Sequence, residues 1–130
     1  LSVAAGTTVM FASDGHLVVR DNGSLNAIGT SSEKITFTGY QETKGFWDYI
    51  RFDGSNNTNN EFQYVDVGFG GGNGSWDAAI YLYDGARFKM GNSTIHDSES
   101  WGLINYNDNS TYIDDGNNTF SNNDDGDIGN

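Results

Sequence analysis

The sequence predicts an all-β fold in which about four to five coils, each built from three short strands, stack into a β-solenoid. Three observations predict this fold. The composition favours turns over helices, with 18 Gly, no Pro and many Asn, Asp, Ser and Thr among 130 residues. Apolar residues recur as short alternating pairs along the whole chain. Finally, residues 91–105 match residues 116–130 at a single offset of 25 residues.

Each alternating pair marks a strand of three to five residues with one inward face, because successive side chains of a strand point to opposite sides. In chain order, the inward positions are Val9/Phe11, Leu17/Val19, Leu25/Ala27, Ile35/Phe37, Ile50/Phe52, Val65/Val67, Ile80/Leu82 and Phe88/Met90, then Ile95, Leu103, Ile113, Phe120 and Ile128. The early and late steps between strands are 7 to 10 residues, and three of them make one 25-residue offset. The three middle steps of 15 residues predict inserted loops at 39–49, 53–64 and 68–79.

The 25-residue offset aligns like with like in successive coils. It places Asn92 over Asn117, and it stacks Ile95 on Phe120 and Leu103 on Ile128. A single coil cannot bury its own apolar face, so it has to stack on a neighbour, with strands pairing in parallel at about 4.8 Å. A β-sandwich is the main alternative because it also uses short, regularly spaced strands, but it predicts hairpins instead of a coil repeat.

The length predicts a single domain over residues 1–130. A solenoid needs polar caps over its first and last coils, and here the chain opens on the strand "LSVAAG" and stops at "DIGN". We therefore expect the domain to belong to a larger protein or assembly. Its expected partners are adjacent coils, further domains or copies of itself placed end to end.

The charge balance excludes several partners. The net charge is −12 with only 6 Lys and Arg, so nucleic acid and anionic membrane surfaces would be repelled. No apolar run approaches the roughly 20 residues of a membrane span. The chain has no Cys, so it has no disulfide framework, and the redox compartment stays open.

Several segments resemble the right-handed parallel β-helix proteins of the pectate-lyase-like superfamily, in particular the repeat regions of large bacterial and archaeal surface proteins. The matching segments are Gly6-Thr7, Gly23 to Thr30, Ile35 to Thr38 and Gly45 to Phe52. The sequence departs from that pattern at Lys34, where the family often has Pro, and at Tyr49, where it often has Gly. The resemblance implies a right-handed coil and an extracellular or cell-surface location, and it leaves the activity open because enzymes, adhesins and fibres share this scaffold.

The sequence predicts no catalytic residue. Uronate lyases need a base with carboxylate-held calcium, and glycosidases need two carboxyls at a set separation. The six cations are scattered, and the adjacent pairs Asp114-Asp115 and Asp124-Asp125 are typical of turns. Ser93, His96 and Asp97 could form a triad by composition, but no nucleophile motif surrounds them.

The tail "NNDDGDIGN" concentrates oxygen donors of the kind that calcium prefers, with Asp124, Asp125 and Asp127 as candidate ligands beside Asn122 and Asn123. It lacks the spacing of an EF-hand loop. The alternative is structural: Asn and Asp at solenoid corners accept backbone hydrogen bonds, and Asn92 over Asn117 would form a ladder. Calcium therefore stays an open candidate cofactor.

Two further sets of residues suggest contact with sugars. Six N-x-[ST] sequons predict glycan attachment, at Asn22, Asn56, Asn73, Asn92, Asn109 and Asn117. Trp76, Trp101 and Tyr83 are candidates for a sugar-stacking face, to which Tyr81 and Tyr106 could contribute. Trp76 is the strongest of these candidates because it lies in a Gly-rich insertion, where core packing does not explain an indole. Trp47, in contrast, matches a position that closes the coil in the family that the chain resembles.

Together these observations predict a non-catalytic structural or adhesive module of a secreted or cell-surface protein, serving as a subunit or segment of a fibre. Two alternatives stay open: a fragment of a polysaccharide lyase or hydrolase, and a calcium-dependent carbohydrate-binding module. Polysaccharide is the candidate ligand of the adhesive module and of the carbohydrate-binding module.

Overall fold

The computed structural model describes all 130 residues and contains fifteen strands and no helix. The strands form five coils of three. The first coil holds β1 (Ser2–Val3), β2 (Thr8–Phe11) and β3 (Leu17–Arg20), and the second holds β4 (Asn26–Ile28), β5 (Ile35–Gly39) and β6 (Ile50–Asp53). The third holds β7 (Glu61–Gln63), β8 (Val65–Gly68) and β9 (Ala78–Tyr83). The fourth holds β10 (Arg87–Gly91), β11 (Thr94–His96) and β12 (Trp101–Asn105), and the fifth holds β13 (Thr111–Asp114), β14 (Thr119–Ser121) and β15 (Gly126–Gly129).

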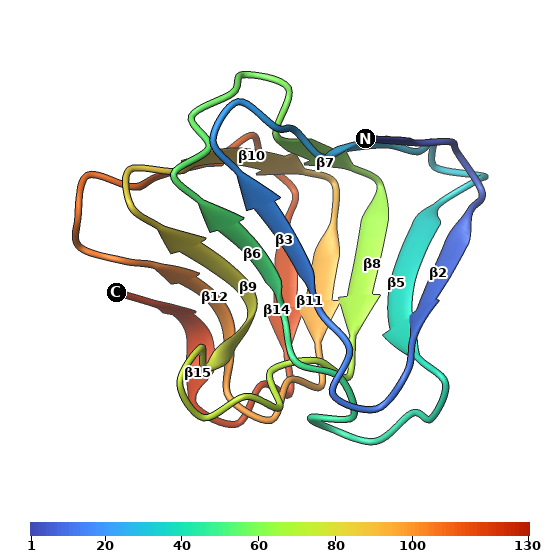
Figure 1. Cartoon of the computed structure of the whole chain (residues 1–130). Coiled ribbons are helices and arrows are strands. Elements are labelled where there is room, and N and C mark those ends of the chain that lie inside the picture. Colours follow the sequence, from blue (N-terminus) through green and yellow to red (C-terminus); the bar gives the residue numbers. More distant parts are fainter.

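Three five-stranded parallel sheets form the walls of the stack (Figure 1). We call them the first sheet (β1-β4-β7-β10-β13), the second sheet (β2-β5-β8-β11-β14) and the third sheet (β3-β6-β9-β12-β15). Neighbours within each sheet come from successive coils and never from adjacent strands of the chain, which excludes the hairpins of a sandwich. The predicted all-β solenoid is confirmed.

The predicted stacking of equivalent residues is also confirmed. Ile95 of β11 pairs with Phe120 of β14, and Leu103 of β12 pairs with Ile128 of β15. Parallel, in-register pairing places each residue beside the residue one coil away, so an inward apolar position continues through the stack.

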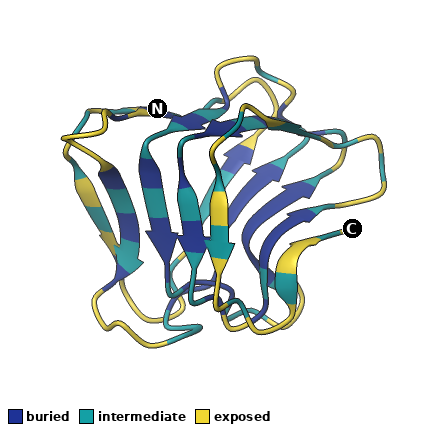
Figure 2. Cartoon of the chain, turned by 180° about the vertical axis from the view of Figure 1, so that it is seen from behind, coloured by how far each residue is buried: buried dark blue, intermediate teal, exposed yellow.

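The core fills the space between the three sheets and is built from columns of stacked side chains. Aromatic rings stack within it: the centroids of Phe11 and Trp47 lie 4.4 Å apart, and those of Phe37 and Phe62 lie 5.3 Å apart. The middle coils are the most deeply buried because each is covered on both sides, while the strands of the first and last coils are more exposed (Figure 2). Trp47 is fully buried in this core, as predicted for the residue that closes the coil.

Two details of the strand prediction are wrong. The loop predicted at 53–64 contains strand β7, whose Phe62 is fully buried in the core. Ile113 was predicted to point inward, but it pairs with Lys89 on the outer face, and Tyr112 takes the inward position beside Phe88. Both errors arise in polar segments with a single apolar residue or two adjacent ones, where alternation does not define the inward face.

The other inserted loops are present as the connections 40–49 and 69–77. The first runs along the stack: Gly71 and Gly72 donate backbone hydrogen bonds to Asp48 and Trp47, and Lys44 forms an ion pair with Asp124 of the last coil. A Cβ on Gly72 would lie only 2.2 Å from the carbonyl oxygen of Gly45, so this close approach requires glycine. The loop therefore ties the second coil to the third and the fifth coils.

Candidate functional site

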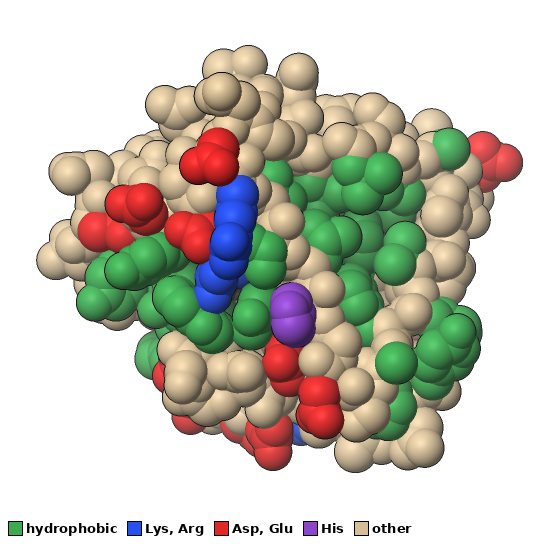
Figure 3. Space-filling model, in the orientation of Figure 1, with side chains coloured by type: hydrophobic (Ala, Val, Ile, Leu, Met, Phe, Trp, Pro, Cys, Tyr) green, Lys and Arg blue, Asp and Glu red, His purple; other side chains and the backbone are tan.

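A second, smaller apolar cluster lies outside the core, on the outer face of the third sheet. Ala78, Tyr81 and Ile104 are buried there, and Trp76, Tyr83 and Trp101 pack against them. Tyr106, directly after β12, stacks with Tyr81 at 6.2 Å between ring centroids. We call Trp76, Tyr81, Tyr83, Trp101 and Tyr106 the aromatic face. Figure 3 shows apolar side chains gathered over the region of β9 and β12, at the left of the view.

Strand alternation and one insertion build this face. Tyr81 and Tyr83 occupy the outward positions of β9, opposite the inward Ile80 and Leu82. Trp76 reaches the face from the connection 69–77, and its ring centroid lies 5.1 Å from Tyr81 and 5.2 Å from Tyr83 in edge-on contacts. The structure thus brings together the three predicted residues Trp76, Trp101 and Tyr83.

Arg51 of β6 forms the floor beneath Trp76. Its guanidinium carbon lies 4.0 Å from the Trp76 ring centroid and 5.4 Å from that of Tyr49. Nη2 donates a hydrogen bond of 3.1 Å to Asp53, while the buried Nε has no acceptor within the chain. Arg51 is only 7% exposed, so its charge interacts with Asp53 and the Trp76 ring and not with solvent. The cation–π contact holds the Trp76 indole against the sheet. The outward position of Arg51 follows from alternation, but its indole partner does not.

Trp101 lies over the last coil because two glycines leave room for it. A Cβ on Gly126 would come within 2.7 Å of Cζ3 of the Trp101 ring, and a Cβ on Gly129 would come within 2.8 Å of Cδ2. One side of the indole therefore rests on the backbone of β15. The half-buried Trp101 ring is the part of the aromatic face that offers a flat surface.

Carboxylates border the aromatic face. Burial, then Asp77, Tyr106 and Asp108, raise the pKa of Tyr81 to about 12, so its hydroxyl stays protonated at neutral pH. Burial alone would raise the pKa of Asp108, but hydrogen bonds from Ser110, Asp84 and Gly85 outweigh it and lower this pKa. The surroundings of the aromatic face are therefore acidic.

Stacked polar residues occupy the solenoid corners. Nδ2 of Asn117 donates a 3.1 Å hydrogen bond to Oδ1 of Asn92, and both residues have left-handed backbone conformations, with φ of 58° and 51°. Asn122 donates to Asp97 in the same way at the next corner, and Oδ1 of Asn123 accepts from the Ser98 amide at 3.0 Å. The predicted Asn92–Asn117 ladder is present as a bond between two side chains, while the adjacent Asn118 satisfies backbone groups by accepting from the Ser93 amide and donating to the Met90 carbonyl.

Of the three tail carboxylates proposed for calcium, only Asp124 has a side-chain partner, and Asp125 and Asp127 are exposed. Asp124 pairs with Lys44, whereas Asn122 and Asn123 belong to the corner hydrogen bonds. No group of three or more His, Cys, Asp or Glu side chains is arranged to hold a metal ion. Calcium at Asp124, Asp125 and Asp127 stays a prediction, and it would need main-chain or amide oxygens as further ligands.

His96 lies between two carboxylates on the outer face of the second sheet. Its Nε2 is 3.2 Å from Asp66 and its Nδ1 is 2.7 Å from Asp97. The hydrogen bond with Asp66, opposed by burial and reinforced by Asp97, raises the pKa of His96 to about 9. Ser93 is engaged elsewhere, donating to the Gly91 carbonyl at 2.8 Å and accepting from the Val65 amide at 3.0 Å. Ser93, His96 and Asp97 thus do not form a triad.

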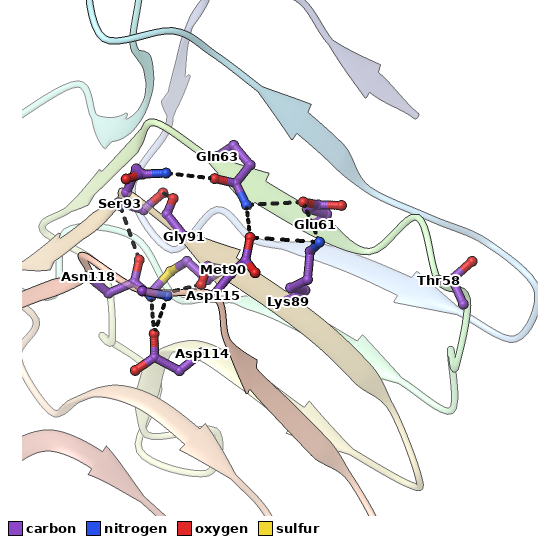
Figure 4. Close-up of polar contacts among 12 residues, drawn as sticks. Thr58, Glu61, Gln63, Lys89, Met90, Gly91, Ser93, Asp114, Asp115 and Asn118 are labelled. Atoms are coloured by element: carbon purple, nitrogen blue, oxygen red, sulfur yellow. Dashed lines mark hydrogen bonds and ion pairs between the residues drawn. The ribbon is translucent and has the colours of Figure 1, made fainter.

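A polar network covers the outer face of the first sheet (Figure 4). Nζ of Lys89 lies 3.0 Å from Glu61 and 3.8 Å from Asp115, and Nε2 of Gln63 donates to Asp115 at 2.8 Å. The hydrogen bond with Glu61 raises the pKa of Lys89 above its usual value, so Lys89 stays a charged ammonium. This lysine is a cross-strand partner of carboxylates rather than an available base.

The six sequons divide into two groups of three. Asn22, Asn56 and Asn109 are exposed and lie on the connections from the third sheet to the first, along one edge of the stack. In contrast, Asn73 accepts from Ser75 and donates to Asp48, and Asn92 and Asn117 belong to the corner ladder. Asn117 is also exposed, but its amide donates to Asn92, so the amides of Asn22, Asn56 and Asn109 are the ones open to modification. Glycan attachment itself stays a prediction.

Fold and surface define this chain as a parallel β-solenoid with an aromatic outer face. Comparison with protein-family models, with curated proteins and with solved structures gives no match. No helix long and apolar enough to cross a membrane is present.

Proposed function

We propose that the chain is a non-catalytic structural or adhesive module of a secreted or cell-surface protein, and that it binds polysaccharide on its aromatic face. The pectate-lyase-like resemblance and the six sequons support the extracellular location. The observation that carries the binding proposal is the convergence of Trp76, Trp101 and Tyr83 on one outer face. Apolar clusters outside the core mark interaction sites, and Trp and Tyr offer sugars a rigid apolar surface with a polar tip.

The contacts of the ionisable residues support a binding role over catalysis. Arg51 is paired with Asp53 and stacked under Trp76, and Lys89 is held by Glu61 and Asp115. A base has to reach a substrate proton without a competing partner, and these groups already have partners. The same contacts argue against the lyase alternative, which needs a free base, and the hydrolase alternative is tested by assaying for products.

Retention on polysaccharides tests the binding proposal. The protein should be retained on at least one insoluble polysaccharide or immobilised oligosaccharide, and no new reducing ends or unsaturated uronates should form. Trp76→Ala and Trp101→Ala should each weaken binding, with melting curves recorded to show that the fold is kept. Tyr40→Ala is the matched control, because Tyr40 is 69% exposed and lies outside the aromatic face. Equal weakening by Tyr40→Ala, or retention unaffected by both Trp variants, would refute the aromatic face as the binding surface.

Intrinsic fluorescence gives a second readout. Trp47 is fully buried, so any change in emission on adding a sugar has to come from Trp76 or Trp101.

Product formation from any polysaccharide would overturn the non-catalytic assignment.

We also propose that solenoid ends associate, with another coil, domain or copy packing on the first coil. The support is an open hollow of about 260 Å³ at that end, lined by Leu1, Leu17, Val19 and Leu25 among others. Figure 3 shows apolar side chains around a hollowed surface at the right of the view. Light scattering tests this proposal: mass should rise with concentration, and Leu17→Lys should prevent the rise. A strictly monomeric species at high concentration would overturn it.

A further inference from the structure

The charges around the aromatic face indicate which sugars it accepts. Four carboxylates lie on or beside it. Asp53 is the cross-strand partner of Tyr83, and Asp108 acts electrostatically on Tyr81. Asp77 directly follows Trp76 in the chain, and Asp84 directly follows Tyr83. The ion pairs on this face join Arg20 and Arg51 to Asp53, at 3.7 and 3.1 Å. Asp77 and Asp84 are left without a cationic partner.

The two arginines do not offset this acidity toward a ligand. Arg51 is buried under the Trp76 ring, and Arg20 shares its partner Asp53 with Arg51. Asp84 is exposed and Asp77 is half-buried, so both can meet a bound molecule. The whole chain adds to the effect with a net charge of −12.

We infer that the aromatic face selects polysaccharides whose sugars carry no acid groups, and that it binds sugars with a free amine best. This inference rests on the proposed polysaccharide-binding function. The Trp101 and Trp76 rings supply apolar contact to a sugar ring, and the unpaired carboxylates of Asp77 and Asp84 supply acceptors for its polar groups. A hydroxyl donates a hydrogen bond to such a carboxylate, an ammonium adds the attraction between opposite charges, and a uronate is repelled.

Three hexasaccharides with the same β-1,4 linkage separate these contributions: glucosamine hexamer, cellohexaose and mannuronate hexamer. Calorimetry at low salt and slightly acidic pH, where the amines are charged, should give the tightest binding for the glucosamine hexamer. Exposed ion pairs change an equilibrium constant by about 1.4- to fivefold each, so two of them predict a preference over cellohexaose of about two- to twenty-five-fold. The mannuronate hexamer should not bind.

Salt dependence and charge removal test the cause of the preference. The Debye length falls from about 30 Å at 0.01 M salt to about 3 Å at 1 M, so high salt should bring the glucosamine hexamer close to cellohexaose. Asp77→Asn with Asp84→Asn should remove most of the preference and weaken cellohexaose binding only slightly, because each Asn keeps one oxygen acceptor. Glu33→Gln is the matched control: it removes one exposed carboxylate from the connection between β4 and β5, away from the aromatic face, and should leave the preference intact.

The outcomes distinguish the inference from the function on which it rests. If none of the three hexamers binds and no other saccharide is retained, the proposed function fails. If cellohexaose binds as tightly as the glucosamine hexamer, or if the mannuronate hexamer binds, only the selectivity is overturned. A preference that survives the double Asp variant, or that is lost equally in Glu33→Gln, would refute the role given to Asp77 and Asp84.

Discussion

The contacts of His96 predict that the stability of this solenoid depends on pH in a defined window. His96 of β11 lies over Gly68, where a Cβ would come within 2.6 Å of its Cε1, and it bridges Asp66 of the preceding coil and Asp97 of its own corner. The imidazolium can donate to both carboxylates, whereas the neutral ring can donate to only one. The charged form therefore stabilises the contact between the third and fourth coils.

The sign of the effect follows from the direction of each pKa. The pKa of His96 is raised from 6.5 to about 9, so its stabilisation is complete below about pH 6.5 and is lost as the pH rises through about 9. The pKa of Asp97 is lowered by its hydrogen bond to His96, so its stabilisation is present above its unfolded pKa of 3.8 and is lost at lower pH. The contribution of this contact should be largest between about pH 4 and pH 6.5.

The expected magnitude is modest. A pKa raised by this amount corresponds to about 3 kcal/mol if it were fully expressed in the free energy of unfolding. The Asp66 side chain is 38% exposed, and that of His96 is 20% exposed, so solvent screens the pair. We expect about 1 to 2 kcal/mol after this screening.

Urea unfolding of the protein and of His96→Gln tests this prediction. The free-energy difference between them should fall by about 1 to 2 kcal/mol from about pH 6 to about pH 10, because Gln does not titrate. Proton NMR should show the His96 ring titrating near pH 9, and Asp66→Asn should lower that midpoint while Glu33→Gln should not. A midpoint near 6.5, or a free-energy difference that is the same at both pH values, would refute the reasoning.

Three further predictions concern the core, the ladder and the tail. Ile95→Asp should cost several kcal/mol in urea unfolding because Ile95 is fully buried, while Ile113→Asp on the outer face should cost less than about 1 kcal/mol; equal losses would contradict the register. Asn117→Ala should cost about 1 kcal/mol, and adding Asn92→Ala should cost less than a second independent loss; strict additivity would count against the ladder. In the presence of a chelator, Asp124→Asn should lower the melting temperature by removing the ion pair with Lys44. If calcium raises the melting temperature of the unchanged protein, the same substitution should abolish that rise. A melting temperature that calcium does not change would contradict calcium binding and leave the hydrogen-bonded ladder as the role of the tail.

Much of the candidate surface could be predicted from residue types, but its assembly could not. Trp76 and Tyr83 stand out because their rings lie outside the inward alternation, whereas Trp101 is two residues before the inward Leu103 and only the structure places it on the outer face. Their meeting on one face depends on the path of the connection 69–77, which carries Trp76 back over Arg51. The contacts of Lys44 with Asp124, 80 residues apart, have no local sequence signal at all.

The sequence by itself determined the architecture. Alternating apolar residues define one inward face per strand, and a 25-residue repeat with Asn over Asn requires coils that stack in register, as Ile95 on Phe120 and Asn92 on Asn117 show. These features are local or periodic, so they can be read from the chain alone.

Only the tertiary structure decided the inward residue of β13, the existence of β7 and the surroundings of the aromatic face. In β13, Tyr112 and Ile113 are adjacent and both apolar, and the neighbouring strand β10 selects Tyr112 by placing Phe88 beside it. In β7, a single Phe62 becomes a core residue because the strands above and below provide its hydrogen-bond partners. The physical reason is the same in both cases: a strand of three or four residues has too few side chains to define its own faces, so the neighbouring coils define them.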